Sequence, residues 1–323
     1  MSSLPLFSAF IVATNFIPEV AASDMNISPV NTATFSLYVV LAAYTVFQSI
    51  RALGILRRPH PNSTQEDKRI PPERVPYVNV FFATLTLIAC YVLETIWIPI
   101  DLSKDSLGAN LNNTFYFMLA ADQLSDIFIA SALLHFIDNQ RDLLGRRHND
   151  EEPTSTHAIS SAKKKILDRI LLSCMAIVAF AGLIVGTVVI RAIPNPDQGY
   201  IIYTGLYHAY IAMYFVTTLN VTLSAWFLWR GLSALGAPNE KITSVIFKHI
   251  IPLLIVRVLF KISVDTVTSV TSTPFDINYD VLGLIEAIVE CVTYAAVLYM
   301  SLSLARPLKK QNESIKDVSE ENA

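Results

Sequence analysis

Long apolar runs separated by short polar segments dominate the chain. A bilayer core about 30 Å thick needs roughly 20 apolar residues in a helix, and seven runs reach that length. Prolines fall mostly between the runs, so the interior of each run can continue as a helix. We therefore predict an all-α, polytopic membrane protein with a seven-helix transmembrane domain over 31–305. The predicted spans are 33–56, 77–100, 115–137, 168–190, 201–229, 243–268 and 279–304.

Two prolines lie inside these runs and should change the helix that holds them. Pro99 is close to the end of the second run and is predicted to terminate that helix. Pro252 lies inside the sixth run, where the missing backbone N–H predicts a kink.

The distribution of Lys and Arg predicts the orientation of the chain in the membrane. Basic residues concentrate in the segments 51–76 and 139–169 and in the tail 306–323, whereas the opposite side holds only Lys104 and Arg191. Basic residues beside short loops are retained in the cytosol. We therefore expect the N-terminus to be lumenal or outside, the C-terminal tail to be cytosolic, and 138–167 to form a polar cytosolic loop.

The N-terminal segment 1–30 should then lie on the lumenal side. Its short apolar stretch over 4–17 lacks a basic n-region, which favours an interfacial segment over a cleaved signal peptide, although both remain open. Asn26 and Asn112 are the glycosylation motifs on that side. The expected location is a multi-pass position in the endoplasmic reticulum or the plasma membrane.

Composition narrows the class of protein further. Hydrophobic residues make up 53% of the chain and charged residues 16%, which excludes a soluble or disordered protein, and the net charge of −3 gives no basic face for nucleic acid. Cys90, Cys174 and Cys291 all lie in apolar runs, so we interpret them as buried small hydrophobic residues rather than disulfide or metal ligands. No metal and no cofactor are predicted.

Ionisable side chains inside the spans are the candidate functional residues, because a charge in lipid costs several kcal/mol unless it is paired or hydrated. The acids fall at similar depths on the lumenal side, where a shared cavity is expected. The candidate catalytic acids are Glu94, Asp122, Asp126, Asp265, Glu286 and Glu290. The candidate substrate-binding residues are His208, Tyr210, Arg257 and Lys261.

Helical spacing predicts which of these side chains face together. Asp122 and Asp126 are four residues apart, as are Glu286 and Glu290, and Arg257, Lys261 and Asp265 step by four along the sixth span. We expect Lys261 to pair with Asp265 in its own helix and Arg257 to pair with Glu290 from the seventh.

The simplest interpretation of these groups is a set of mutually satisfied pairs that hold the bundle together. Six acids facing two bases argue against it, because so many carboxylates cannot all be ionised in a medium of low dielectric constant. At least one carboxyl should therefore stay protonated at neutral pH, ready to act as a general acid.

The architecture resembles a group of small fungal membrane proteins. Seven spans, an outside N-terminus, a short basic tail and a lumenal half that holds Glu94, Asp122, Asp126, Asp265 and Glu290 are similar to the integral membrane proteins of meroterpenoid and indole-diterpene pathways, some of which are terpene cyclases.

The resemblance implies a mechanism and partners. A lipophilic, prenylated substrate would enter from the bilayer, and Asp122 or Asp126 would open an epoxide or protonate an alkene. Glu94 and Glu290 would stabilise the cation or remove the final proton. Other pathway enzymes at the same membrane would be its partners, or the chain would be an accessory to such a cyclase.

Two other functions use the same residues. Seven helices in this orientation are also the receptor architecture, with Arg and acid pairs as a ligand pocket or a switch, although the third span ends in IDNQRD rather than in a receptor signature. A proton-coupled carrier of a small molecule would use the acids as proton relays.

Overall fold

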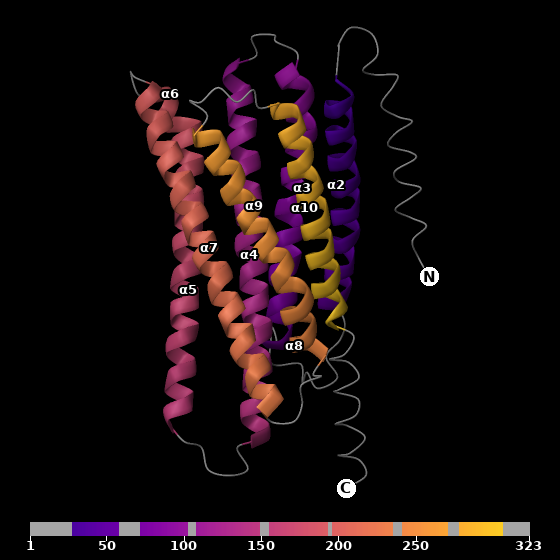
Figure 1. The fold of residues 1–323 in the computed structure, drawn as a ribbon, viewed down its shortest axis with the longest axis vertical. Coiled ribbons are helices and arrows are strands. Elements are labelled where there is room, and N and C mark those ends of the chain that lie inside the picture. Colours follow the sequence, from indigo (N-terminus) through magenta and orange to yellow (C-terminus); the bar gives the residue numbers. More distant parts are fainter. Residues whose placement is uncertain are drawn as a thin grey trace.

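The computed structural model describes residues 28–57, 72–102, 108–148, 155–192, 196–234, 241–270 and 278–305. Within these ranges the chain is helical and contains no strand, and the long helices run side by side along one axis (Figure 1). The all-α fold is therefore confirmed.

The elements are α2 (Pro29–Leu56), η1 (Pro72–Arg74), α3 (Val75–Leu102), α4 (Gly108–His148), α5 (Ser155–Ile184), η2 (Val185–Val189), α6 (Ile190–Ala192), α7 (Pro196–Ala234), α8 (Lys241–Val245), η3 (Ile246–Ile250), α9 (Ile251–Val270) and α10 (Tyr279–Ser303).

Six of these helices are long and apolar enough to cross a membrane, which makes the chain a multi-pass membrane protein. They lie in α2, α3, α4, α5, α7 and α10. The stretch that corresponds to the sixth predicted span, α8–η3–α9, is also helical but is not among the six. The 20-residue α9 carries Arg257, Lys261 and Asp265, so its composition differs from that of a lipid-exposed span.

The two intrahelical prolines behave differently from the predictions. The prediction that Pro99 terminates its helix is wrong, since α3 continues to Leu102. A proline removes one i→i−4 hydrogen bond, which can kink a helix without ending it. Pro252 is the second residue of α9, just after the π-helical turn η3, and the N–H of Ile251 between them bonds the carbonyl of Ile246, five residues back. The irregularity expected at Pro252 thus takes the form of a π-helical turn.

The predicted polar loop over 138–167 is largely helical, so that prediction is wrong. α4 continues to His148 and α5 begins at Ser155. Charged residues and leucine are good helix formers, and an ion pair between Lys165 and Asp142, 3.0 Å long, joins the two extensions. The apolar stretch 4–17, the tail 306–323 and Asn26 lie outside the described residues.

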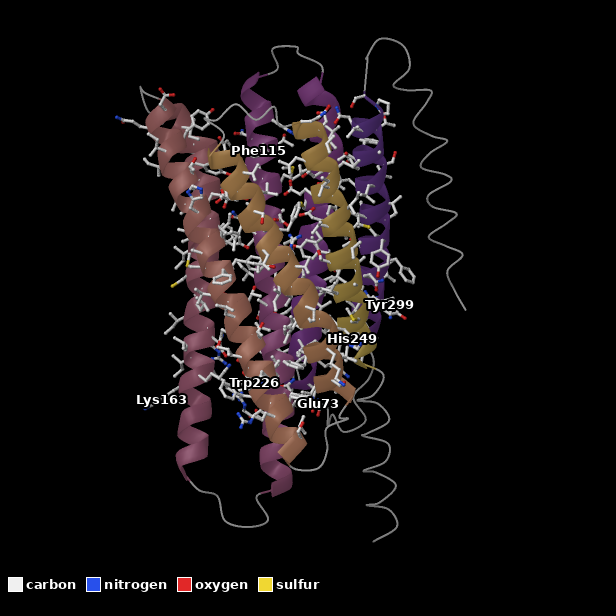
Figure 2. All side chains as sticks on the ribbon, in the orientation of Figure 1. Glu73, Phe115, Lys163, Trp226, His249 and Tyr299 are labelled. Atoms are coloured by element: carbon white, nitrogen blue, oxygen red, sulfur yellow. The ribbon has the colours of Figure 1, made fainter. Side chains whose placement is uncertain are left out.

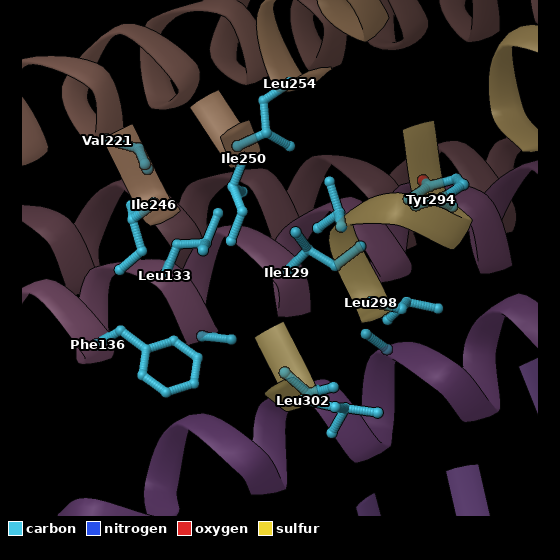
Figure 3. Packing of buried hydrophobic residues seen from close by; sticks show 14 of the residues in the cluster. Ile129, Leu133, Phe136, Val221, Ile246, Ile250, Leu254, Tyr294, Leu298 and Leu302 are labelled. Carbon is cyan, nitrogen blue, oxygen red and sulfur yellow. The ribbon is translucent and has the colours of Figure 1, made fainter. Parts of the chain in front are cut away.

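α4 is the central helix of the bundle. In its apolar stretch 72% of the residues are buried, compared with 22% in α5. Ile129 and Leu133 of α4 pack in one apolar cluster with Ile250 of η3 and Leu298 of α10 (Figure 3). Any polar side chain in the middle of α4 is therefore enclosed by other helices rather than by lipid.

The outer faces of the helices present large apolar side chains, as lipid contact requires. Ile177, Ile201 and Phe227 are each more than half exposed. Cys174 is exposed on α5 as well, so the prediction that it is buried is wrong, whereas Cys90 is buried as expected.

Candidate functional site

Arg257 of α9 lies buried in the middle of the bundle and binds three carboxylates from two other helices. Its Nη2 donates to Oδ1 of Asp122 at 2.6 Å and its Nε to Oδ1 of Asp126 at 3.0 Å, both on α4. Its Nη1 donates to Oε1 of Glu290 on α10 at 3.3 Å. The predicted pairing of Arg257 with Glu290 is confirmed, and the same guanidinium also binds both acids of α4.

Lys261, one turn further along α9, binds the same two aspartates. Its Nζ lies 2.6 Å from Oδ2 of Asp122 and 2.6 Å from Oδ2 of Asp126. The predicted pair with Asp265 is wrong, because two buried carboxylates on α4 compete for Lys261 and leave Asp265 to another partner. Asp265 instead forms an ion pair with Nε2 of His208, 3.2 Å away.

Tyr294 of α10 completes the centre. Its ring lies 3.6 Å from the guanidinium carbon of Arg257, and its hydroxyl contacts Nη2 of the same arginine. The hydroxyl is also 2.7 Å from Oδ1 of Asp126, 3.1 Å from Oδ1 of Asp122 and 2.7 Å from Oγ of Ser125. Sequence reasoning missed this residue, although it lies four positions beyond Glu290 on the same polar stripe. We call Asp122, Asp126, Arg257, Lys261, Glu290 and Tyr294 the Arg257 network.

α7 encloses the network from a further side. The hydroxyl of Tyr210 donates to the carbonyl of Gln123 at 2.9 Å and lies 3.3 Å from Oδ2 of Asp126. Nζ of Lys261 lies 5.4 Å from the centre of the Tyr214 ring. Tyr210 thus lies at the site where it was expected. His208 does not, because its side chain is 44% exposed and pairs with Asp265 outside the network.

Glu94 of α3 and Glu286 of α10 are close to the network and half-buried. Glu94 interacts electrostatically with Glu290, Glu286 and Asp122, and Glu286 with Asp122 and both cations. Among the described residues neither forms an ion pair. Five of the six predicted acids therefore lie close together, and three of them bond directly to Arg257 or Lys261.

The surplus of acids over bases that the sequence predicts is still present in this arrangement. Three carboxylates bond directly to two cations, and Asp265 has its own partner. Burying a charge is costly unless it is paired and hydrogen-bonded. Here each cation of α9 bonds at least two carboxylates, so neither cation is left unpaired in the bundle interior.

A small cavity adjoins the network on the side of α5 and α7. Its volume of about 10 Å³ has room for roughly one water molecule. Tyr116, Gln123, Tyr203 and Tyr207 line it, and the carbonyl of Gln123 already accepts from Tyr210.

Two further expectations concern metals and glycans. Among the described residues, no group of three His, Cys, Asp or Glu side chains is placed to hold a metal ion. Asn112 lies near the start of α4, and its glycosylation stays a prediction. Compared with known proteins, the chain matches no protein-family model and no curated protein.

Proposed function

We propose that this chain is a seven-helix, receptor-like membrane protein in which the Arg257 network holds the bundle in one conformation until a lipophilic small molecule is bound. The observation that carries the proposal is the position of Arg257 and Lys261, which lie on α9 and are bonded to carboxylates of α4 and α10 in the bundle interior. We further propose that α8–η3–α9 is the seventh crossing, with the N-terminus lumenal or outside and the C-terminus cytosolic. The endoplasmic reticulum and the plasma membrane are the candidate membranes.

Such a network resists separation of its helices. Removing one partner of a buried ion pair typically costs about 3–5 kcal/mol, because the other charge is left unpaired. We therefore expect the contacts among α4, α9 and α10 to break in one step rather than one by one. The three helices would then act as one unit with two discrete conformations. The contact between Arg257 and Glu290 is the longest of the ion pairs in the network, 3.3 Å, so we expect it to open first.

Trp229 provides a built-in reporter of such a change. It stacks on Phe247 with ring centres 5.3 Å apart, which links α7 to η3 just before α9. In a chain with Trp97→Phe and Trp226→Phe, tryptophan emission comes from Trp229 alone. The full chain in lipid nanodiscs would be titrated with a panel of lipophilic compounds, including a prenylated aromatic epoxide, while emission is recorded and products are analysed by mass spectrometry.

The outcomes separate the candidate functions. A saturable change in emission without chemical conversion supports the receptor-like function, and Glu290→Gln should shift the ligand-free emission toward the bound value. Chemical conversion of a compound would contradict the receptor-like function and identify the protein as an enzyme. Uptake of the compound into vesicles, driven by a pH gradient, would contradict the receptor-like function and identify a proton-coupled carrier.

A membrane enzyme is the second candidate, because Glu94 and Glu286 lie beside the network without an ion pair among the described residues. Both carboxylate oxygens of Asp122 and of Asp126 are bonded to Arg257 or Lys261, so neither carboxyl is free to face a substrate. In a cyclase-like reaction the general acid would therefore be Glu286 or Glu94, close to where a prenylated substrate could enter from the bilayer.

Glutamine substitutions test the enzyme directly. Glu94→Gln and Glu286→Gln keep the shape of each side chain and remove its acidity, so one of them should reduce product formation by about 100-fold. Asp142→Asn, an exposed carboxylate at the far end of α4, is the matched control. Equal product formation by all three variants would exclude both glutamates as the acid.

A further inference from the structure

A second polar centre lies away from the Arg257 network, at the end of the bundle where α4 ends and α5 begins. Lys163 of α5 marks this end in Figure 2, opposite to Phe115. Here a cavity of about 250 Å³ opens between the start of α3, the last turns of α4 and α5. That is near the lower limit of ligand pockets, which span roughly 300–1,000 Å³, and suits a small molecule.

The cavity combines apolar walls with charged groups. Val75, Leu134 and Leu172 form its apolar part. Its polar part includes the carboxylates of Asp138, Asp142 and Asp168, together with Lys165 and Arg169. Apolar walls with a few placed polar groups are typical of small-molecule sites.

Two of the three carboxylates already have partners. Asp168 is buried and accepts from Nζ of Lys164 at 2.7 Å and from Nδ2 of Asn220 on α7 at 2.7 Å. Asp142 accepts from Nζ of Lys165 at 3.0 Å. These bonds fix the walls of the cavity and occupy both lysines.

Asp138 differs from both. Its Oδ1 is buried and has no hydrogen-bond partner among the described residues. Lys164, Lys165 and Arg141 interact with it electrostatically, but the two lysines are bonded to other carboxylates. Asp138 as a whole is half-buried and lines the cavity, so a ligand there meets a carboxylate that has no hydrogen bond from the described residues. An N–H donor from that ligand would therefore be stabilising.

We propose that this cavity binds a small organic amine whose ammonium group donates to Asp138 and whose apolar body packs on Val75, Leu134 and Leu172. Charge-assisted hydrogen bonds of N⁺–H to a carboxylate are roughly twice as strong as neutral ones, which gives the site its selectivity for an ammonium group with N–H donors. The site does not involve any residue of the Arg257 network.

Phenethylammonium is a suitable probe, since it joins a primary ammonium to an apolar body. The full chain in phosphatidylcholine nanodiscs would be titrated by isothermal calorimetry with phenethylammonium and, as a neutral analogue of the same shape, with 2-phenylethanol. We expect saturable binding of the amine and at least about tenfold weaker binding of the alcohol. Equal binding of the two compounds, or no binding of the amine, would overturn the proposal.

Two variants locate the bound amine. Asp138→Asn should weaken binding of phenethylammonium by about tenfold or more. Asp280→Asn, which removes an exposed carboxylate at the start of α10 that does not line the cavity, should change it by less than about threefold. Unchanged binding in Asp138→Asn would contradict the assignment. The comparison with 2-phenylethanol on the unmodified chain remains decisive if Asp138→Asn does not fold.

The source of the amine is tested by changing the lipid. Phosphatidylcholine has no N–H donor in its headgroup, whereas phosphatidylethanolamine has a primary ammonium. Displacement of the probe in phosphatidylethanolamine nanodiscs would identify a lipid headgroup as the ligand. Equal binding in both lipids would identify a free amine.

Discussion

The ring of Tyr294 lies 3.6 Å from the guanidinium carbon of Arg257, while the hydroxyl of the same tyrosine contacts the guanidinium and the aspartates of α4. One side chain thus serves two purposes. Its face stabilises the cation, and its edge supplies a hydrogen bond to the carboxylates that balance that cation. Tyr294 also belongs to the apolar core that continues toward Leu298, so it joins the polar centre to the packed interior (Figure 3).

Replacing Tyr294 by Phe should destabilise the protein although the ring is kept. The variant loses the hydroxyl at a buried centre of charged groups, where a hydrogen bond contributes about 1.5–3 kcal/mol. Thermal unfolding of the detergent-solubilised chain, followed by tryptophan fluorescence, should show a lower midpoint.

Tyr44→Phe is the matched control for this change. The hydroxyl of Tyr44 donates to the carbonyl of Ala295 at 3.0 Å, a neutral hydrogen bond between α2 and α10. Its loss should cost less, about 0.5–1.5 kcal/mol. A Tyr44→Phe variant less stable than Tyr294→Phe would contradict the central role of Tyr294.

Arg257→Met should be among the most destabilising single substitutions in the chain. It leaves Asp122 and Asp126 with Lys261 as their one directly bonded cation among the described residues, and Glu290 with none. Breaking a buried ion pair costs about 3–5 kcal/mol. The yield of monodisperse protein and the unfolding midpoint should both fall.

Two companion variants identify the cause of this loss. Asp126→Asn added to Arg257→Met removes one of the carboxylates left unpaired, and should recover part of the stability. Arg230→Met is the control, because the guanidinium of Arg230 has a cation–π contact with Trp226, 5.6 Å to the ring centre, worth about 0.5–1 kcal/mol. No recovery in the double variant would show that Arg257 acts through packing rather than charge.

Gly186 is required by a close approach of Tyr116. A Cβ at position 186, in the π-helical turn η2, would lie 2.4 Å from ring atoms of Tyr116. Gly186→Ala should therefore destabilise the protein by about 1–3 kcal/mol, as overpacking does. Gly182→Ala, one turn earlier with nothing within 4 Å of the added Cβ, should leave the unfolding midpoint unchanged or raise it. Equal midpoints for the two variants would contradict the close packing at η2.

The proposed orientation in the membrane predicts where glycans can be attached. If the N-terminus is lumenal, Asn26 and Asn112 face the glycosylation machinery. Endoglycosidase should increase the gel mobility of the full chain, and Asn26→Gln with Asn112→Gln should abolish that shift. A shift that persists in the double variant, or that requires Asn62 in a predicted cytosolic segment, would contradict the orientation.

The sequence was sufficient to predict helices over the apolar runs and to predict five of the six acids that come together. Apolar runs determine the helices, and the i, i+4 stripes of Arg257 and Glu290 predicted a contact that is present. The same reasoning gave the wrong partner for Lys261, because spacing along one helix says nothing of which neighbouring helix supplies competing carboxylates. That choice depends on helix packing, which a single sequence does not specify.

The limits of the helices were predicted less well, for a related reason. The end of an apolar run marks where lipid contact ends, but the helix itself can continue beyond that point. α4 does so to His148, through a segment that contains arginine and leucine, both good helix formers. Tyr294 was missed because tyrosine is common at membrane interfaces, and its role depends on the guanidinium above its ring.

The composition of α9 has a consequence for how the protein is made. A helix with two cations is poorly suited to lipid by itself, and its partners on α4 are synthesised before it whereas Glu290 of α10 follows. If α9 crosses the membrane as proposed, we expect it to join α4 while the rest of the chain is still being synthesised. Loss of Asp122 or Asp126 should then affect assembly of the nascent chain first. Variants at these positions should be removed by proteases early in biogenesis.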